Sequence, residues 1–205
     1  YARTVYSGGD LFIVEDGGEG TFDLVIRCNF APDITIGSEK FGTIQSAIDH
    51  SQNGDTIRLA DKTYTGFYNR DLDLDGHSVT IESVSGHPED CVIDCEGVTR
   101  GMVINSGETS VTLRGFSIIN GAGFFTGAGL QCSGTSPDIS NCIFKDNAST
   151  NAFGGGIYLS ASNAVFSNCV ITGNSVVSGV GASGGGIYCG GASSPTFMNC
   201  TITGN

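Results

Sequence analysis

Positive charge is scarce in this chain. It has nine lysine and arginine residues against 21 aspartate and glutamate residues, and its formal net charge at pH 7 is -12. A surface so poor in cations does not attract phosphate backbones or anionic lipid headgroups. We therefore expect no nucleic acid and no anionic membrane among its partners. The acidity itself indicates only solubility or cation binding.

Long apolar runs and histidines are scarce as well. No run approaches the roughly 18 apolar residues of a membrane span, and no charged-then-apolar leader opens the chain, so we expect no membrane insertion. The chain has three histidines, His50, His77 and His87, and they are scattered along the sequence. Surface or turn positions are therefore expected for them rather than a metal site.

Helical patterns are almost absent. The exception is residues 43–50, where Thr43 is a suitable N-cap and Ile44, Ala47 and Ile48 recur on one helical face. An alternating segment, residues 56–59, follows and is typical of a strand. This order predicts a short helix that caps the N-terminal end of a β-rich core.

The sequence does contain a repeat, over residues 127–205. Each repeat opens with a glycine cluster, continues to an Asn-Cys pair and closes with a further asparagine. Both asparagine series are spaced by 27 and then 31 residues (141 to 168 to 199, and 147 to 174 to 205). Such a period with variable insertions indicates a stacked repeat protein, whose units cannot bury their apolar faces alone. The Asn-Cys pairs are Asn141-Cys142, Asn168-Cys169 and Asn199-Cys200, and the closing residues are Asn147, Asn174 and Asn205.

The segments inside each repeat are short and rich in β-forming residues. Helical repeats need ten or more residues of 3.6-residue pattern, and the glycines, serines and asparagines here would weaken such helices. Short strands wound into a parallel coil place each residue about 4.8 Å from its counterpart one rung away. The sequence therefore predicts an all-β fold, a parallel β-helix of about six rungs over residues 37–205. Residues 1–36 are expected to form an extension packed on the coil, with strands at 11–14 and 22–28 around the acidic turn 15–20.

Strand alternation assigns the side chains of each rung to two faces. We expect Leu130 and Cys132, and their counterparts in later rungs, to point inward. The outward column is expected to contain Ile104, Gln131, Tyr158 and Tyr188. Two further columns follow from the Asn-Cys pairs. Asn141, Asn168 and Asn199 are expected at sharp corners as an asparagine ladder, beside an internal column of Cys142, Cys169 and Cys200.

Eight cysteines permit disulfide bonds in an oxidising compartment. The repeat phase favours free thiols instead, because Cys142, Cys169 and Cys200 point the same way and are odd in number. Cys91 and Cys95, if extended, lie about 13 Å apart, beyond bridging distance. We therefore expect mostly buried free thiols, with disulfide bonds as the alternative.

Two stretches resemble a known class of fold. Residues 34–37, 41–49 and 54–57, ending near Thr63 and Tyr64, resemble the N-terminal cap and first coil of right-handed parallel β-helix proteins such as pectin methylesterases. The later Gly-Gly-x-Ile and Ile/Phe-x-x-Asn elements resemble the repeats of polymorphic outer-membrane and other secreted β-helix proteins. The resemblance covers residues 34–205 and implies a right-handed, single-stranded, pectin-lyase-like parallel β-helix that is secreted or displayed at the cell surface. It is weak for function, since this fold supports many activities.

The catalytic motifs of these enzymes are missing. The sequence has none of the pectin methylesterase or polygalacturonase motifs, and residues 116–205 contain only three charged side chains, Asp138, Lys145 and Asp146. General acid-base catalysis usually needs two positioned titratable groups. The repeats supply no such pair.

A calcium loop is a second possibility. Residues 71–76 with Glu82 fit the pattern D-x-D-x-D-G-x5-E, in which alternate carboxylates converge on one ion. No helices flank it, Ser78 replaces the usual apolar residue, and Leu72 and Leu74 alternate as in a strand. We expect a strand followed by a turn and no cofactor, with calcium as the alternative.

The outward tyrosines suggest a binding surface. Tyr158 and Tyr188, with Gln131 below them and Phe124, Phe125 and Phe153 in nearby loops, combine aromatic rings with an amide, as a sugar ring requires. The alternative is ordinary β-propensity on a solvent-facing strand.

These observations leave three functional hypotheses. The first is a non-catalytic extracellular structural or adhesive module that binds a polysaccharide or cell-surface glycan. The second is a carbohydrate-active lyase, hydrolase or epimerase whose active residues lie outside the repeats or beyond residue 205. The third is head-to-tail self-association. The chain begins at Tyr1, and Asn205 closes a repeat without a polar cap, so we expect a piece of a longer protein whose last rung is followed by more rungs or by a docked partner.

Overall fold

The computed structural model describes residues 2–7, 10–15, 33–150, 153–177 and 183–205. The first two segments form an antiparallel hairpin of β1 (Ala2–Ser7) and β2 (Asp10–Glu15). The expected strand at 11–14 lies within β2. The expected strand at 22–28 and most of the acidic turn lie outside the described residues, and the packing of residues 1–36 on the coil stays a prediction.

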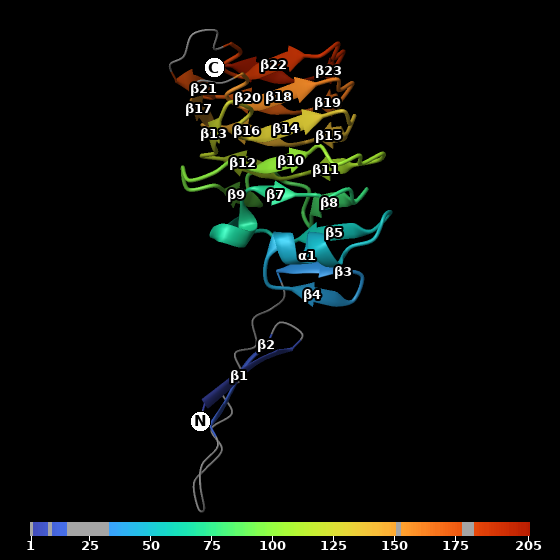
Figure 1. Cartoon of the computed structure of the whole chain (residues 1–205), viewed down its shortest axis with the longest axis vertical. Coiled ribbons are helices and arrows are strands. Elements are labelled where there is room, and N and C mark those ends of the chain that lie inside the picture. The colour runs from blue at the N-terminus through green and yellow to red at the C-terminus, as the bar shows by residue number, and fades with distance from the viewer. Residues whose placement is uncertain (1, 8–9, 16–32, 151–152, 178–182) are drawn as a thin grey trace, which may run out of the picture.

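The rest of the described chain is a coil of short strands stacked in parallel (Figure 1). Each turn adds one strand to each of three sheets, named here by their size. From Thr56 onward the described residues make five complete turns, and β23 and β24 begin a sixth. The predicted all-β parallel β-helix is confirmed.

The strands of the coil are as follows. The five-stranded sheet contains β7 (Leu72–Asp73), β10 (Met102–Ile104), β14 (Leu130–Ser133), β18 (Ile157–Ser160) and β22 (Ile187–Gly190). The eight-stranded sheet contains β3 (Ile34–Ile36), β4 (Glu39–Phe41), β5 (Thr56–Leu59), β8 (Thr80–Ser83), β11 (Thr112–Arg114), β15 (Asp138–Ser140), β19 (Val165–Ser167) and β23 (Thr196–Met198). The six-stranded sheet contains β6 (Thr63–Tyr64), β9 (Val92–Asp94), β12 (Ser117–Ile119), β16 (Ile143–Lys145), β20 (Val170–Thr172) and β24 (Thr201–Thr203). A three-stranded sheet of β13 (Ala122–Phe124), β17 (Ala148–Thr150) and β21 (Ser175–Val177) flanks the later turns.

The N-terminal edge of the coil is covered by the chain itself. The strand β3 pairs antiparallel with β5, and β4 pairs with β3. Helix α1 (Ile44–His50) begins after Thr43, whose hydroxyl accepts a hydrogen bond from the Ser46 N–H as predicted for an N-cap. Its apolar residues are fully buried. The helix is confirmed and its role as the cap of the coil stays a prediction. Head-to-tail self-association also stays a prediction. A second copy could pair with the N-terminal edge only by displacing β3, β4 and α1, which cover it.

The inward columns form the core, and most follow the predicted alternation. Leu130, Cys132 and their partners Ile157 and Leu159 are fully buried. The expected outward position of Ile104 is wrong by one residue. Ile104 pairs with Cys132 and is fully buried, whereas Val103 pairs with Gln131 in the outward column. All three residues of β10 are apolar and buried, so alternation in that strand carried no signal of which one faces out.

The asparagines of the Asn-Cys pairs lie at the expected corners. Asn141, Asn168 and Asn199 have φ angles of 52°, 53° and 51°, in the left-handed region that asparagine tolerates. They form only part of a ladder. The Asn199 amide donates to Asn168 Oδ1 at 2.6 Å, but the Asn141 amide donates to the carbonyl of Gly86 instead.

The continuous ladder is built from the closing asparagines. Asn147 and Asn174 are buried, and the Nδ2 groups of Asn147 and Asn174 donate to Oδ1 of Asn174 and Asn205 at 2.9 and 2.8 Å. The backbone N–H groups of Asn147 and Asn174 donate to the same two oxygens at 3.1 and 3.0 Å. The sequence located these residues as a repeat but gave no sign that they, rather than the corner asparagines, are the buried set.

The glycine clusters make room for this ladder. A Cβ atom added at Gly156 would lie 2.8 Å from Cγ of Asn174, and one added at Gly186 would lie 2.8 Å from Cγ of Asn205. Both distances are too short for real side chains. The glycines and the closing asparagines therefore recur with the same spacing because each ladder amide packs against a residue without a side chain.

The expected cysteine column is present. Cys142 and Cys169 are buried and Cys200 is half-buried. In the described part of the chain seven cysteines are free, and five of them are buried: Cys91, Cys95, Cys132, Cys142 and Cys169. Desolvation raises the pKa of Cys142 to about 12 and that of Cys169 to about 11. These thiols are protonated at neutral pH and behave as small apolar side chains.

We expect the substitution Asn174→Ala to destabilise the fold by about 3 kcal/mol or more, because it leaves buried amide and carbonyl groups without partners. The Asn174 side chain donates to the Phe144 carbonyl and to Asn205, and it accepts from Asn147. The matched control Asn105→Ala removes an exposed asparagine whose backbone is not left-handed and should cost less than about 1 kcal/mol. Urea denaturation measures both. Equal losses would show that the buried ladder has no special role.

Thiol labelling of the native protein at pH 8, mapped by peptide mass spectrometry, should modify Cys189 and spare the five buried cysteines. The cause is the lack of solvent access combined with the raised pKa of the buried thiols. All seven described cysteines should react after denaturation without reductant. Fewer than four reactive thiols in denaturant would show that disulfide bonds form.

Candidate functional site

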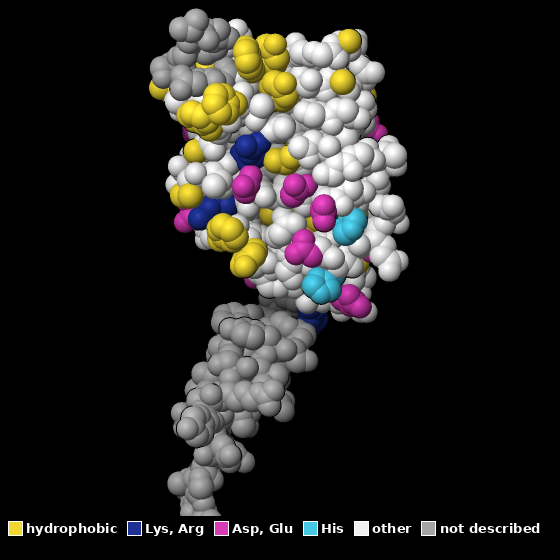
Figure 2. Space-filling model, viewed as in Figure 1, with side chains coloured by type: hydrophobic (Ala, Val, Ile, Leu, Met, Phe, Trp, Pro, Cys, Tyr) yellow, Lys and Arg dark blue, Asp and Glu magenta, His cyan; other side chains and the backbone are white. Residues whose placement is uncertain are grey.

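The outer face of the five-stranded sheet carries one column of side chains along the whole coil. Strand pairing places Asp73, Val103, Gln131, Tyr158 and Tyr188 in register, one per turn. Five positions spaced by about 4.8 Å extend over about 19 Å. This face is turned to the viewer in Figures 1 and 2. Charged side chains gather over the N-terminal half of the coil, and hydrophobic ones lie toward its C-terminal end and at the lower left beside the charged groups (Figure 2).

The C-terminal half of this face is aromatic. The rings of Tyr158 and Tyr188 stack with centroids 5.6 Å apart and planes 9° apart, and the Phe153 ring lies 4.7 Å from that of Tyr188. Both tyrosines are half-buried. Because each ring covers a face of the other, the tyrosine pair presents mainly ring edges and hydroxyl groups to solvent.

The loop aromatics lie beside this pair. The Phe153 N–H donates to the Phe125 carbonyl at 3.2 Å, which places the two residues on neighbouring turns. Phe125 is 61% exposed, and its ring contacts that of Phe124 edge to face at 4.2 Å. The predicted residues Gln131, Tyr158, Tyr188 and Phe153 thus come together, with Phe125 at their flank. Their role in glycan binding stays a prediction.

Gln131 belongs to a polar network rather than to the aromatic stack. Its Oε1 accepts hydrogen bonds from Arg100 and, at 2.7 Å, from the Thr126 hydroxyl. The Arg100 Nε forms an ion pair with Asp71 at 3.3 Å. The amide oxygen that a sugar hydroxyl would use is therefore occupied by the protein.

A pocket of about 200 Å³ lies next to this network. Two exposed aromatic residues stand in its wall: Phe67 is 73% exposed and Tyr68 is 59% exposed, and their rings meet edge to face at 5.0 Å. Both belong to the 3-10 helix η1 (Phe67–Asn69). The other lining residues are Gln45, Arg70, Asp71, Asp73 and Thr99.

Sequence analysis missed this pocket. Its aromatic residues stand in the connection between β6 and β7, outside the repeats that contain the predicted aromatic column. The signal was available, because a Phe-Tyr pair after Gly66 interrupts the strand pattern and precedes a charged segment. The lining residues come from separate elements and share no sequence motif.

Hydrogen bonds from helix α1 hold the pocket in place. The Gln45 side chain donates to the Asp73 carbonyl at 3.0 Å and accepts from the Asp73 N–H at 3.0 Å, so it pairs with the open edge of β7 as another strand would. The Ile44 N–H donates to Asn69 Oδ1 at 2.9 Å, which ties the helix to η1. These bonds fix the backbone on both sides of the pocket.

Most of the charges at the pocket are paired. Arg70 forms an ion pair with Glu96, and Arg100 with Asp71. The Asp73 carboxylate accepts the Asp75 N–H at 2.9 Å and forms no ion pair with any described residue. Three carboxylates (Asp71, Asp73 and Glu96) therefore meet two guanidinium groups, and one negative charge is left over.

The predicted calcium loop does not form one ligand cluster. Leu72 and Leu74 are fully buried, as expected for a strand. Glu82 lies in β8 of the eight-stranded sheet, where it pairs with Arg114 and, at 3.0 Å, with Arg58. Within the described ranges no three or more His, Cys, Asp or Glu side chains are arranged to hold a metal ion. The strand and turn are confirmed, and the absence of a cofactor stays a prediction.

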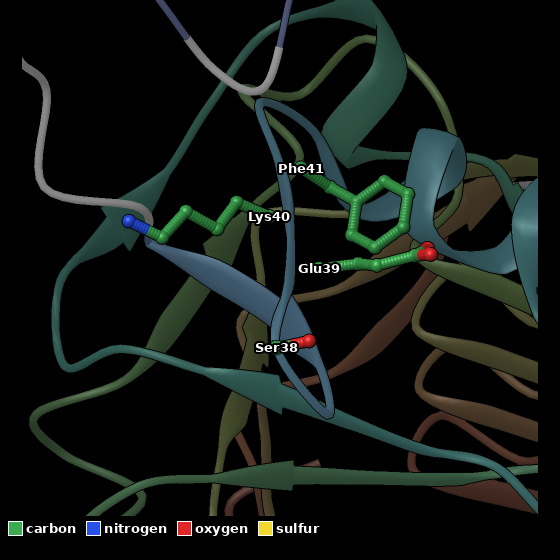
Figure 3. A pocket seen from close by; sticks show the side chains of 4 residues that line it. All are labelled: Ser38, Glu39, Lys40 and Phe41. Atoms are coloured by element: carbon green, nitrogen blue, oxygen red, sulfur yellow. The ribbon is translucent and has the colours of Figure 1, made fainter.

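A different pocket lies at the hairpin of β3 and β4, away from the column of outward side chains. Ser38, Glu39, Lys40 and Phe41 line it (Figure 3). Figure 3 shows Glu39 and Phe41 extending to one side of β4 and Lys40 to the other, as strand alternation requires. The Phe41 ring contacts that of His50 at 5.6 Å. This pocket brings together no set of converging polar groups.

Comparison with protein families matches residues 3–202 to the right-handed β-helix region. The chain belongs to the right-handed β-helix family. No curated protein and no solved structure matches it. The resemblances to pectin methylesterases and to polymorphic outer-membrane proteins are therefore not confirmed beyond the shared fold. The helices of the described residues are too short or too polar to cross a membrane.

Proposed function

We propose that this right-handed β-helix is a non-catalytic extracellular module that binds a polysaccharide on the outer face of its five-stranded sheet. The observation that carries the proposal is the exposed Phe67–Tyr68 pair in the wall of a pocket whose other side chains are amide, hydroxyl and charged groups. A sugar combines an apolar ring face with a rim of hydroxyl groups. Exposed aromatic rings next to hydrogen-bonding groups complement both parts.

The length of the face favours a chain of sugars over a single one. The column from Asp73 to Tyr188 runs about 19 Å, and four of its five side chains are polar or aromatic, Val103 being the exception. The pocket end offers exposed ring faces, whereas the Tyr158–Tyr188 end offers hydroxyl groups and ring edges. We place the main stacking contacts at Phe67 and Tyr68 and the secondary contacts at the tyrosine pair.

The charge pairing supports binding over catalysis. Asp71 is engaged by Arg100, and Glu96 by Arg70. The described turns beyond Arg114 add no charged side chain to this face. A binding surface tolerates such neutralised groups, whereas acid-base catalysis needs side chains that are free to exchange a proton.

The substitution Phe67→Ala should weaken binding to the preferred oligosaccharide about tenfold, because it removes the most exposed stacking face of the pocket. Tyr158→Ala should weaken it about threefold, since that ring is already covered. Val84→Ala, which also removes an exposed apolar side chain but lies at the end of β8, is the matched control. A glycan array identifies the ligand and calorimetry measures the affinities. Unchanged binding by both aromatic variants would refute the proposal.

A second candidate function is cleavage of the polysaccharide. It is favoured by one observation, that Asp71 and Asp73 line the same pocket together with Arg70. Paired carboxylates are the groups that glycoside hydrolysis uses.

The two candidates differ in turnover. If the chain is an enzyme, it releases new sugar ends from the bound polysaccharide, and Asp73→Asn abolishes the release while binding persists. If it is a binding module, prolonged incubation of the preferred oligosaccharide leaves its length unchanged. Chromatography of the incubated sugar distinguishes the outcomes, with heat-denatured protein as the control.

A further inference from the structure

We propose that the pocket beside Phe67 and Tyr68 binds the ammonium group of an amino sugar, so that the preferred polysaccharide contains unacetylated amino sugars. This inference rests on the proposed function and names the class of ligand for the same face. Three features of the pocket support it: an unpaired carboxylate, a wall of exposed aromatic rings, and too few carboxylate oxygens to hold a metal ion.

The pocket carries a surplus negative charge. Arg70, which lines the pocket, forms an ion pair with Glu96, and Arg100 forms one with the pocket residue Asp71. Asp73 is exposed and keeps an uncompensated carboxylate, since the one described contact of that carboxylate is the Asp75 N–H. An acidic sugar would be repelled by this surplus, and the net charge of the whole chain, -12, acts in the same direction. A positively charged ligand would instead be attracted by the unpaired Asp73 carboxylate.

The aromatic wall of the pocket suits an ammonium group. A primary ammonium group binds best where a carboxylate accepts its hydrogen bonds and aromatic ring faces stabilise its charge. Asp73 and the Phe67–Tyr68 pair line the same pocket. The Gln45 side chain holds the backbone of Asp73 at its N–H and carbonyl, so the carboxylate projects from a fixed strand edge.

The pocket fits an organic cation better than a metal ion. Calcium takes six to eight oxygen ligands, and magnesium requires a near-octahedral set. The pocket wall is partly aromatic, Asp71 is held by Arg100, and Glu82 lies in another sheet. Too few carboxylate oxygens converge for a metal ion, but one carboxylate suffices for an ammonium group.

The test measures binding to the intact chain by calorimetry at pH 6. It compares glucosamine and N-acetylglucosamine oligomers of the same length and linkage, and a galacturonate oligomer of the same length. We expect the glucosamine oligomer to bind about tenfold more tightly than its N-acetylated form, and the galacturonate oligomer to bind most weakly. Added salt should reduce only the advantage of the charged amine.

The variant Asp73→Asn should remove the advantage of the glucosamine oligomer, because the affinity for this oligomer falls by much more than the affinity for the N-acetylated one. The control Asp138→Asn removes the same charge from an exposed residue of the eight-stranded sheet and should change neither affinity. Melting temperatures of both variants check that they fold.

The outcomes separate the two proposals. Equal binding of the two glucosamine forms, equal loss of both in Asp73→Asn, or preference for galacturonate overturns the amino-sugar assignment and leaves polysaccharide binding in place. If no oligosaccharide binds in this test or on the array, both proposals are wrong.

Discussion

The amide ladder of the buried Asn147 and Asn174 and the terminal Asn205 is the interaction on which the rest of this structure depends. A side-chain amide inside an apolar coil is costly unless all its donors and acceptors are satisfied. Here the amides of Asn147 and Asn174 donate to the asparagine of the next turn. All three ladder amides also donate to a backbone carbonyl of the preceding turn. A shift of one turn by a single residue would break several of these bonds at once, so the ladder holds neighbouring turns in register.

This register decides the composition of the surface. Because strand alternation is fixed by the ladder and by the apolar columns beside it, the side chains on the outer face of the five-stranded sheet form a straight row rather than a scattered set. The same alignment reduces the ring surface that is free to contact a ligand. It stacks Tyr158 directly on Tyr188 and covers the ring faces that would otherwise contact a ligand. The exposed ring faces are found instead in η1, outside the regular coil, where stacking between turns does not apply.

Much of the fold was accessible from the sequence, for identifiable reasons. The repeat of glycines and asparagines indicated stacking, the short strands excluded helical repeats, and the cap signal at Thr43 located helix α1. The errors occurred where the pattern was ambiguous. In β10 three consecutive apolar residues hid the direction of Val103 and Ile104. The two asparagine series had the same spacing, so their periodicity could not show which one is buried.

The candidate site likewise has parts that the sequence indicated and parts that it did not. The sequence by itself determined the coil, its inward columns and the row of Gln131, Tyr158 and Tyr188, because these depend on local alternation and on a repeat that can be read along the chain. Only the tertiary structure decided the pocket, since Gln45, Phe67, Asp73 and Thr99 belong to different elements and meet only after the coil closes. It also decided which charges are free. Ion pairing between turns occupies Asp71 and Glu96 and leaves Asp73 unpaired, and this depends on distances between turns that the linear sequence does not contain.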